Sequence, residues 1–149
     1  MKAVVQRVSE ASVAVEDRVV ASIGPGLLVL LGVAPGDGER EIAWMAHKLP
    51  ALRIFADDAG QMNRSLIDIS GSILLVSQFT LFGDCRKGNR PSFISAGPPA
   101  GAHAHYLELA HRLRTQLGEN RVGTGVFGVS MQVRLLNDGP VTILLETPL

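Results

Sequence analysis

Cysteine is nearly absent from the sequence, aromatic residues make up only 5% of it, and neither sign of charge is in excess. The single cysteine, Cys85, excludes a disulfide within the chain and favours a reducing, cytoplasmic setting. Because 14 basic residues balance 14 acidic ones, a generally basic coat that binds nucleic acid without regard to sequence is not expected. A local basic patch is compatible with this balance.

Long apolar runs are lacking as well. The longest, Leu27 to Leu31, is far too short to span a bilayer. The N-terminal residues alternate in character and do not form the apolar core of a signal peptide. No linker, repeat or low-complexity stretch divides the chain, and 46% of its residues are apolar. The sequence therefore predicts one soluble domain, residues 1–149, with no membrane partner.

The first part of the chain has the pattern of β-strands. Residues 4–8, 11–15 and 18–23 are rich in valine and partly alternate, which suits half-buried strands. A strong turn, Gly-Pro-Gly, is expected at 24–26. The apolar run 27–33 is bounded by glycines and predicts a strand that is buried on both faces.

Two amphipathic helices are predicted. The first begins after Asp37 as its N-cap and ends or kinks at Pro50, and its apolar residues recur at helical spacing: Ile42, Met45, Ala46 and Leu49. The second ends before Gly118, a residue type common just beyond a helix C-terminus. Its apolar stripe comprises Tyr106, Leu107, Ala110, Leu113 and Leu117.

Further strands are predicted around these helices. A short strand at 53–56 precedes a turn at 57–60, and the clearest internal strand runs over 72–81. Three more strands close the chain, at 121–126, 130–136 and 141–146. This order predicts an α+β domain with a mixed or antiparallel sheet, and it does not fit a doubly wound nucleotide-binding fold.

Polar residues stand at the end of the internal strand. Because side chains alternate along a strand, Gln78 and Thr80 are expected on one face, and Ser77 and Phe79 on the other. A hydroxyl and an amide that converge at a strand end suit a polar pocket. Composition alone favours the simpler alternative, in which the strand runs out into solvent.

Two loops carry further candidate residues. Asn137-Asp138-Gly139-Pro140 joins two predicted strands and has the composition of a hairpin turn, and nothing in the local sequence decides whether its Gly-Pro bond is cis or trans. The long loop 82–101 contains three cations, Arg86, Lys87 and Arg90. These side chains can contact phosphates, and they equally fit a solvated basic loop.

No group of residues predicts a metal or cofactor site. The four histidines, His47, His103, His105 and His111, lack zinc-ligand spacing with a cysteine or a third ligand, and they are expected to face solvent. Cys85 has no histidine nearby in the sequence to complete a nucleophilic pair, so it is interpreted as incidental. We expect neither a metal nor another cofactor.

Five stretches in order carry a resemblance to a known family. They are MKAVVQRVSEASVAV at the start, GLLVLLGV, SQFTLFGD, RKGNRPSF and NDGPVT. Together they resemble the D-aminoacyl-tRNA deacylases from end to end. The resemblance implies a homodimer with a curled, barrel-like sheet. It also implies a cytoplasmic carboxylic ester hydrolase that releases D-amino acids from tRNA, and glycine mischarged on tRNA-Ala.

The resemblance also implies roles for particular residues. The Gly139–Pro140 bond should be cis, and this turn should enter the pocket of the other subunit, where its carbonyl groups exclude an L-side chain. Arg7 is expected to brace the turn. Phe127 and Met131 should wall the pocket, with Ser77 and Asn137 as supporting residues. Ser130 stands where many members have an acidic residue, which puts one local polar contact in doubt.

The chemistry that the resemblance implies is an ester hydrolysis at the aminoacyl end of tRNA. The backbone N–H groups of Phe79 and Thr80 are expected to bind the oxyanion, and Gln78 to position the 3′-terminal adenosine or the attacking water. A nucleophilic Thr80 hydroxyl would need a base, and the sequence offers none. Attack by water, assisted by the 2′-hydroxyl of the substrate, is therefore preferred. Arg86, Lys87 and Arg90 are the expected tRNA contacts.

Two other functions remain open from the sequence. One is a different ester or amide hydrolase that uses Thr80 or Cys85 as its nucleophile. The other is a non-enzymatic module that binds RNA ends.

Overall fold

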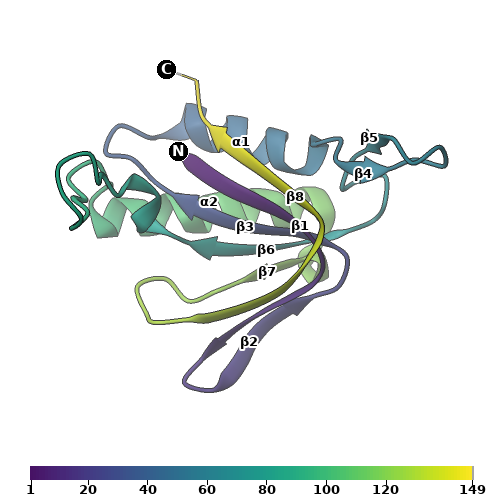
Figure 1. Ribbon diagram of the computed structural model, residues 1–149, viewed down its shortest axis with the longest axis horizontal. Helices are drawn as coiled ribbons and strands as arrows, with labels where there is room; N and C mark the ends of the chain where they lie inside the picture. Colours follow the sequence, from purple (N-terminus) through teal and green to yellow (C-terminus); the bar gives the residue numbers. More distant parts are fainter. Residues whose placement is uncertain (149) are drawn as a thin grey trace.

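The computed structural model describes residues 1–148, with six strands in one curled sheet (Figure 1). The elements are β1 (Lys2–Val15), β2 (Arg18–Ile23), β3 (Gly26–Gly32), α1 (Glu39–Ala51), β4 (Phe55–Ala56), β5 (Met62–Arg64), β6 (Ser72–Ser77), η1 (Phe79–Phe82), α2 (Pro99–Leu117), η2 (Glu119–Arg121), β7 (Val122–Thr124) and β8 (Gln132–Glu146). The strand order is β2-β1-β3-β6-β7, and β8 pairs with β1.

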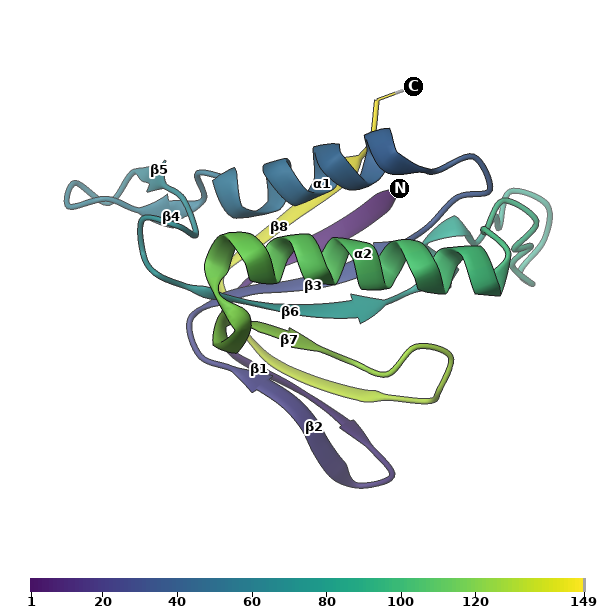
Figure 2. The same cartoon turned by 180° about the vertical axis from the view of Figure 1, so that it is seen from behind.

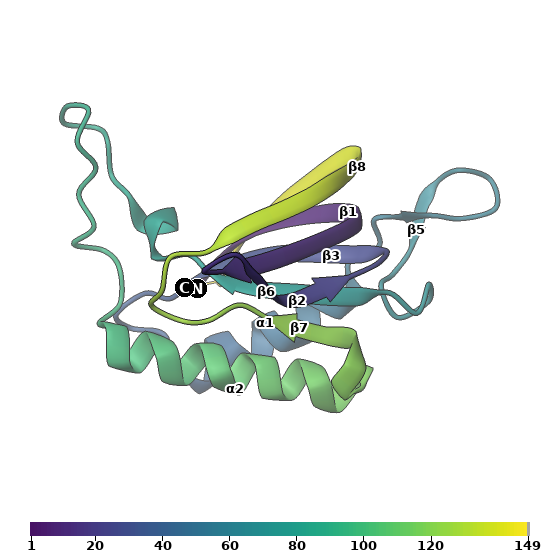
Figure 3. The same ribbon diagram turned by 90° about the horizontal axis from the view of Figure 1, so that it is seen from below.

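The sheet is mixed, as predicted. β1 pairs antiparallel with β2, β3 and β8, whereas β3, β6 and β7 run parallel to one another. Both helices lie on the same face of the sheet, as Figure 2 and Figure 3 show from two sides. The sheet also curls, so that an added Cβ at Gly123 of β7 would lie 3.2 Å from the Cβ of Ala21 of β2. This near closure gives the barrel-like shape.

Two apolar clusters stabilise this arrangement. The larger lies between the sheet and the helices and includes Val29 of β3, Leu75 of β6 and Leu109 of α2, all fully buried. The smaller lies inside the curl and includes Val13 and Leu74. β3 is central, between β1 and β6, and nearly all of its residues are buried. The prediction of a strand buried on both faces is confirmed.

The helices are present where predicted, with two corrections in detail. Asp37 does not cap α1, because its carboxylate binds the N-terminal ammonium at 2.6 Å and the Ala34 N–H at 2.6 Å. The N-cap is Gly38, whose N–H donates to the Glu41 carboxylate at 2.9 Å. In α2, Leu107 is 52% exposed, and the neighbouring Leu109 is buried in its place.

The largest errors in the predicted strands concern where a strand continues or stops. The two N-terminal segments form one continuous strand, β1, and the internal strand ends at Ser77, where the chain turns into the 3₁₀ helix η1. Gln78 and Thr80 therefore do not share a strand face. The last two predicted strands are also one, β8, so residues 137–140 do not form a hairpin.

Residues 137–140 instead form an irregular bulge within β8. The pairing of β8 with β1 shifts register between Gln6 and Val8 and again between Val8 and Glu10. β8 pairs on one side only within the described residues, so its second edge is open. In the part of the chain that the structure describes, neither helix is long and apolar enough to cross a membrane.

Candidate active site

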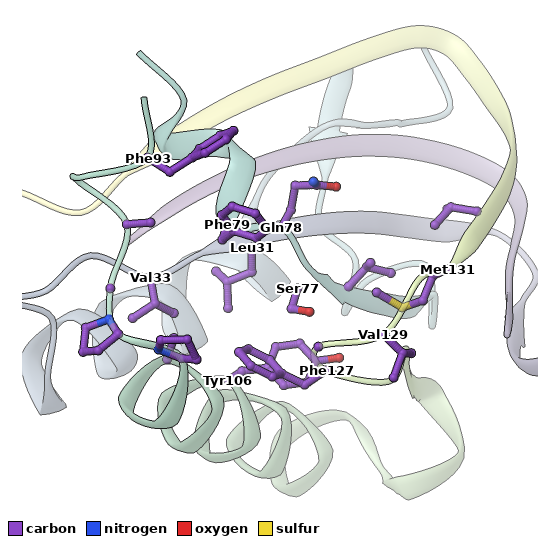
Figure 4. A pocket seen from close by; sticks show the side chains of 18 residues that line it. Leu31, Val33, Ser77, Gln78, Phe79, Phe93, Tyr106, Phe127, Val129 and Met131 are labelled. Atoms are coloured by element: carbon purple, nitrogen blue, oxygen red, sulfur yellow. The ribbon is translucent and has the colours of Figure 1, made fainter. Parts of the chain in front are cut away.

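A pocket of about 810 Å³ opens where the parallel strands β3 and β6 end (Figure 4). The loop before α2, the first turns of α2 and the segment between β7 and β8 complete its walls. Its lining includes Ser77, Gln78, Phe79, Phe93, Tyr106, Phe127 and Met131. Most of the lining is apolar, which suits a flat or apolar ligand group.

The wall formed by α2 is tightly organised. The Tyr106 hydroxyl donates a hydrogen bond to the Leu75 carbonyl at 2.7 Å, and burial raises the pKa of Tyr106 to about 12. Phe127 is held between this tyrosine and His103, whose ring stacks on it with centroids 4.5 Å apart. These contacts fix the aromatic wall in one orientation.

The opposite rim contains free backbone donors. β6 ends at Ser77, and Phe79 and Thr80 begin η1, where the first N–H groups of a helix have no carbonyl before them to bind. Neither N–H has an acceptor among the described residues. The Gln78 side-chain amide donates to the Thr80 hydroxyl. Two adjacent N–H groups at a pocket rim can bind an oxyanion.

Ionisable side chains are scarce in this pocket. Tyr106 is the only one among the lining residues, and its hydroxyl is engaged with a backbone carbonyl. Thr80 is exposed and lies outside the lining, although its hydroxyl contacts Gln78. No lining side chain can therefore serve as a base that activates a hydroxyl nucleophile.

A second group of predicted residues lies on the β8 bulge. The Gly139–Pro140 peptide bond is cis, and both residues are exposed. Arg7 of β1 donates through Nε to the Asp138 carbonyl at 2.9 Å and through Nη1 to the Ile54 carbonyl at 2.7 Å. Gly139, Pro140, Arg7 and the exposed Asn137 do not line the pocket of their own chain.

The third group lies on the loop between η1 and α2. Arg86 forms an ion pair with Asp84 at 2.6 Å and holds the pKa of that carboxyl well below its usual range, at about 2. Lys87 and Arg90 are exposed, with no ion pair or hydrogen bond among the described residues. The structure thus places the predicted residues in three separate regions.

Several residues of the pocket were missed from the sequence. Tyr106 was assigned only to the helix core, and Phe93, Val33 and Ala102 were assigned no role. His105 was expected to face solvent, yet its Nδ1 is buried and has no partner among the described residues. Cys85 is exposed and lies outside the pocket lining. Within the described residues, no three His, Cys, Asp or Glu side chains gather as a metal site.

The sequence matches the family model described as D-Tyr-tRNA(Tyr) deacylase over residues 4–146. The chain belongs to this family. The D-aminoacyl-tRNA deacylase of Prosthecochloris aestuarii is 57% identical over 148 residues, which cover 99% of this chain and all of the relative. The protein of the same name from Myxococcus xanthus is 60% identical over 148 residues, covering 99% of this chain and 95% of the relative.

Two solved structures show the same architecture as this family member. One, described as a c-Myc DNA unwinding element binding protein, is 43% identical and superposes with a TM-score of 0.95 over the whole of both chains. The other, described as a probable eukaryotic D-amino acid tRNA deacylase, is 20% identical, with a TM-score of 0.82 over 97% of both chains. The second likeness concerns the fold alone.

Proposed function

We propose that the pocket hydrolyses the ester of D-aminoacyl-tRNA and that the Gly139–Pro140 turn of a second subunit selects the hand of the substrate. Family membership and full-length relatives at 57% and 60% identity make the chain a hydrolase of the D-aminoacyl-tRNA deacylase class. We further propose the selection of the D-amino acid, the removal of glycine from tRNA-Ala and the roles of the individual residues. Because charged tRNA is consumed in translation, the proposed location is the cytoplasm.

The single observation that carries the chemistry is the pair of unbound N–H groups at Phe79 and Thr80. In the proposed reaction, the ester carbonyl oxygen accepts hydrogen bonds from this pair, and water adds to the carbonyl carbon. The ester C–O bond then breaks, and the 3′-oxygen of the tRNA takes the proton. The 2′-hydroxyl of the substrate assists the water, because the pocket lining offers no free base.

Thr80 has a supporting role in this scheme. Its hydroxyl accepts a hydrogen bond from the Gln78 amide, which holds the start of η1 beside the strand end. Gln78 itself lines the pocket and is placed to orient the adenosine or the water. A Thr80→Ala variant that binds substrate but has no turnover would support the covalent alternative instead.

Chiral selection is assigned to the β8 bulge of the partner. The bulge is exposed, and Arg7 holds it by binding the Asp138 carbonyl. It does not line the pocket of its own chain, so a second subunit would have to supply it. The backbone carbonyls of Gly139 and Pro140 would occupy the space that an L-side chain needs, whereas a D-side chain points away and glycine has no side chain.

The open edge of β8 supports the homodimer. Unpaired strand edges readily pair with another chain, and β8 also exposes Leu136 and Leu144, at 56% and 76%. The proposed contacts to tRNA phosphates are Arg86, Lys87 and Arg90. Lys87 and Arg90 are favoured, because Asp84 already binds Arg86.

Turnover of matched substrates tests the proposal. We expect release of D-tyrosine from D-tyrosyl-tRNA and of glycine from glycyl-tRNA-Ala, with L-tyrosyl-tRNA left intact. Arg7→Met, which keeps the apolar stem but loses both hydrogen bonds to backbone carbonyls, should lower the ratio of D- to L-turnover. Equal hydrolysis of both hands by the wild-type chain would contradict chiral selection.

One other candidate function follows from the comparisons. The structural relative at 43% identity is described as a DNA element binding protein, which matches the class of non-enzymatic nucleic-acid binders. Such a protein would bind tRNA or DNA without releasing an amino acid, so the same turnover assay separates the two functions.

A further inference from the structure

The chain has seven aromatic side chains, all among the described residues, and only Phe79 and Phe93 are exposed rather than buried or half-buried. These two contact each other, with ring centroids 5.1 Å apart and planes at 69°. Phe79 is 59% exposed and Phe93 is 37% exposed. A ligand that covers an exposed aromatic pair at a pocket mouth removes its apolar rings from water, which favours binding.

The pair is held in a fixed place. Phe79 is the first residue of η1, and Phe93 follows Ser92, whose backbone exchanges two hydrogen bonds with Asp84 at 2.8 and 2.9 Å. The Gly97 N–H then binds the Val33 carbonyl at 2.8 Å, which ties the loop to the end of β3. Figure 4 shows both rings together on one side of the pocket, across from Tyr106 and Phe127.

Positive charge lies on the same loop. The tip beyond the Asp84–Ser92 bridge carries Lys87 and Arg90, which have no ion pair among the described residues. Asp84 is the only acidic residue of the loop, and Arg86 already binds it. Aromatic faces beside unpaired cations are the combination that binds single-stranded nucleic acid, through base stacking and phosphate contacts.

We infer that Phe79 and Phe93 form a stacking platform for the unpaired base that precedes the terminal adenosine of the tRNA 3′ end. The inference rests on the proposed function, which places the terminal nucleoside inside the pocket. The next base then leaves the pocket at its rim, where the two rings lie. Because every base has a π-face, the platform binds without reading base identity. It adds affinity for tRNA and leaves the reacting ester untouched.

Paired substrates test this role. We compare D-tyrosyl-tRNA with 3′-O-D-tyrosyl-adenosine, which lacks the preceding base. Phe93→Ala and Phe93→Leu should each lower kcat/KM for the tRNA about tenfold, through KM. Each should lower kcat/KM for the tRNA by more than it lowers kcat/KM for the adenosine ester, because only the tRNA carries the preceding base, and Phe93→Trp should restore tRNA turnover. Ile94→Ala is the matched control, because Ile94 is 90% exposed and lies outside the pocket lining.

A spectroscopic test reports on stacking directly. A short RNA of tRNA 3′-end sequence, with 2-aminopurine next to its terminal adenosine, should lose fluorescence on binding the wild-type chain and the Ile94→Ala variant. The Phe93→Ala complex, at saturating protein, should keep the fluorescence of the free RNA.

Four outcomes would overturn the inference. The first two are an equal loss of kcat/KM on both substrates and no loss on either. The third is full activity of Phe93→Leu on tRNA. The fourth is a changed molecular mass of Phe93→Ala in sedimentation, which would show that the aromatic pair is a contact between subunits. Failure of the proposed function is distinct, since the wild-type chain would then hydrolyse neither D-tyrosyl ester.

Discussion

Tyr106 is the only ionisable side chain among the residues that line the pocket, and it is not free to act. Its hydroxyl donates to the Leu75 carbonyl, and its pKa is raised to about 12 by burial. A phenol with a raised pKa stays protonated at every pH below that value, so it keeps this hydrogen bond throughout the usual working range. The proposed catalysis at this site therefore depends on backbone groups and on the substrate itself.

A pH profile tests this arrangement at the scale of the residue. We predict that log kcat/KM for the D-tyrosyl adenosine ester shows no bell shape between pH 5 and 9, because no lining side chain changes its charge in that interval. Measurement across this range, with the uncatalysed hydrolysis rate subtracted, checks the prediction. A bell-shaped profile would instead indicate an acid and a base on the protein.

At the scale of the element, the bulge in β8 matters most. Gly139 has φ of 128°, and a Cβ there would lie 2.9 Å from both Arg7 Nη2 and Val141 Cγ2. A residue with a Cβ is strained in this backbone region and would also push against the arginine that binds the bulge. Glycine is therefore needed at this position for the shape of the strand.

Gly139→Ala should lower the free energy of unfolding by about 1–3 kcal/mol. Gly24→Ala is the matched control, since a Cβ at Gly24 has no atom within 4 Å and no positive φ is involved. It should shift stability by less than about 0.5 kcal/mol. Urea denaturation measures both, and equal stability of the two variants would show that the bulge tolerates a side chain.

At the scale of the whole molecule, the balance of 14 basic and 14 acidic residues leaves no general attraction for tRNA. Electrostatic attraction for tRNA must then come from local groups, and we propose that the loop with Lys87 and Arg90 supplies them. Arg86 is partly neutralised, because Asp84 binds it and remains charged at any pH above its own pKa of about 2.

The salt dependence of tRNA affinity tests this local origin. Arg90→Ala should reduce the slope of log K against log salt by about 0.7, the value for one contact to single-stranded nucleic acid. Arg86→Ala should reduce it less, because its charge is shared with Asp84. Titrations at several salt concentrations give the slopes. A wild-type slope in Arg90→Ala would remove this residue from the contacts.

The hydrophobic pattern of the sequence was enough to determine most of the elements. β2 has the predicted limits, Arg18–Ile23, and both helices lie where apolar residues recur at helical spacing. Such patterns can be read from the local sequence, because the buried face of a helix or a strand requires apolar residues at a characteristic spacing. The family resemblance also indicated Gln78, Phe79 and Phe127, which the pocket brings together.

Only the tertiary structure decided where strands continue or stop. Residues 137–140 have the composition of a hairpin, yet pairing with β1 keeps β8 extended through them, because Arg7 and the β1 ladder bind the bulge from the side. Conversely, β6 stops at Ser77 although the apolar pattern goes on. The contact between Phe79 and Phe93, residues of separate segments, depends on packing alone, and no local period could indicate it.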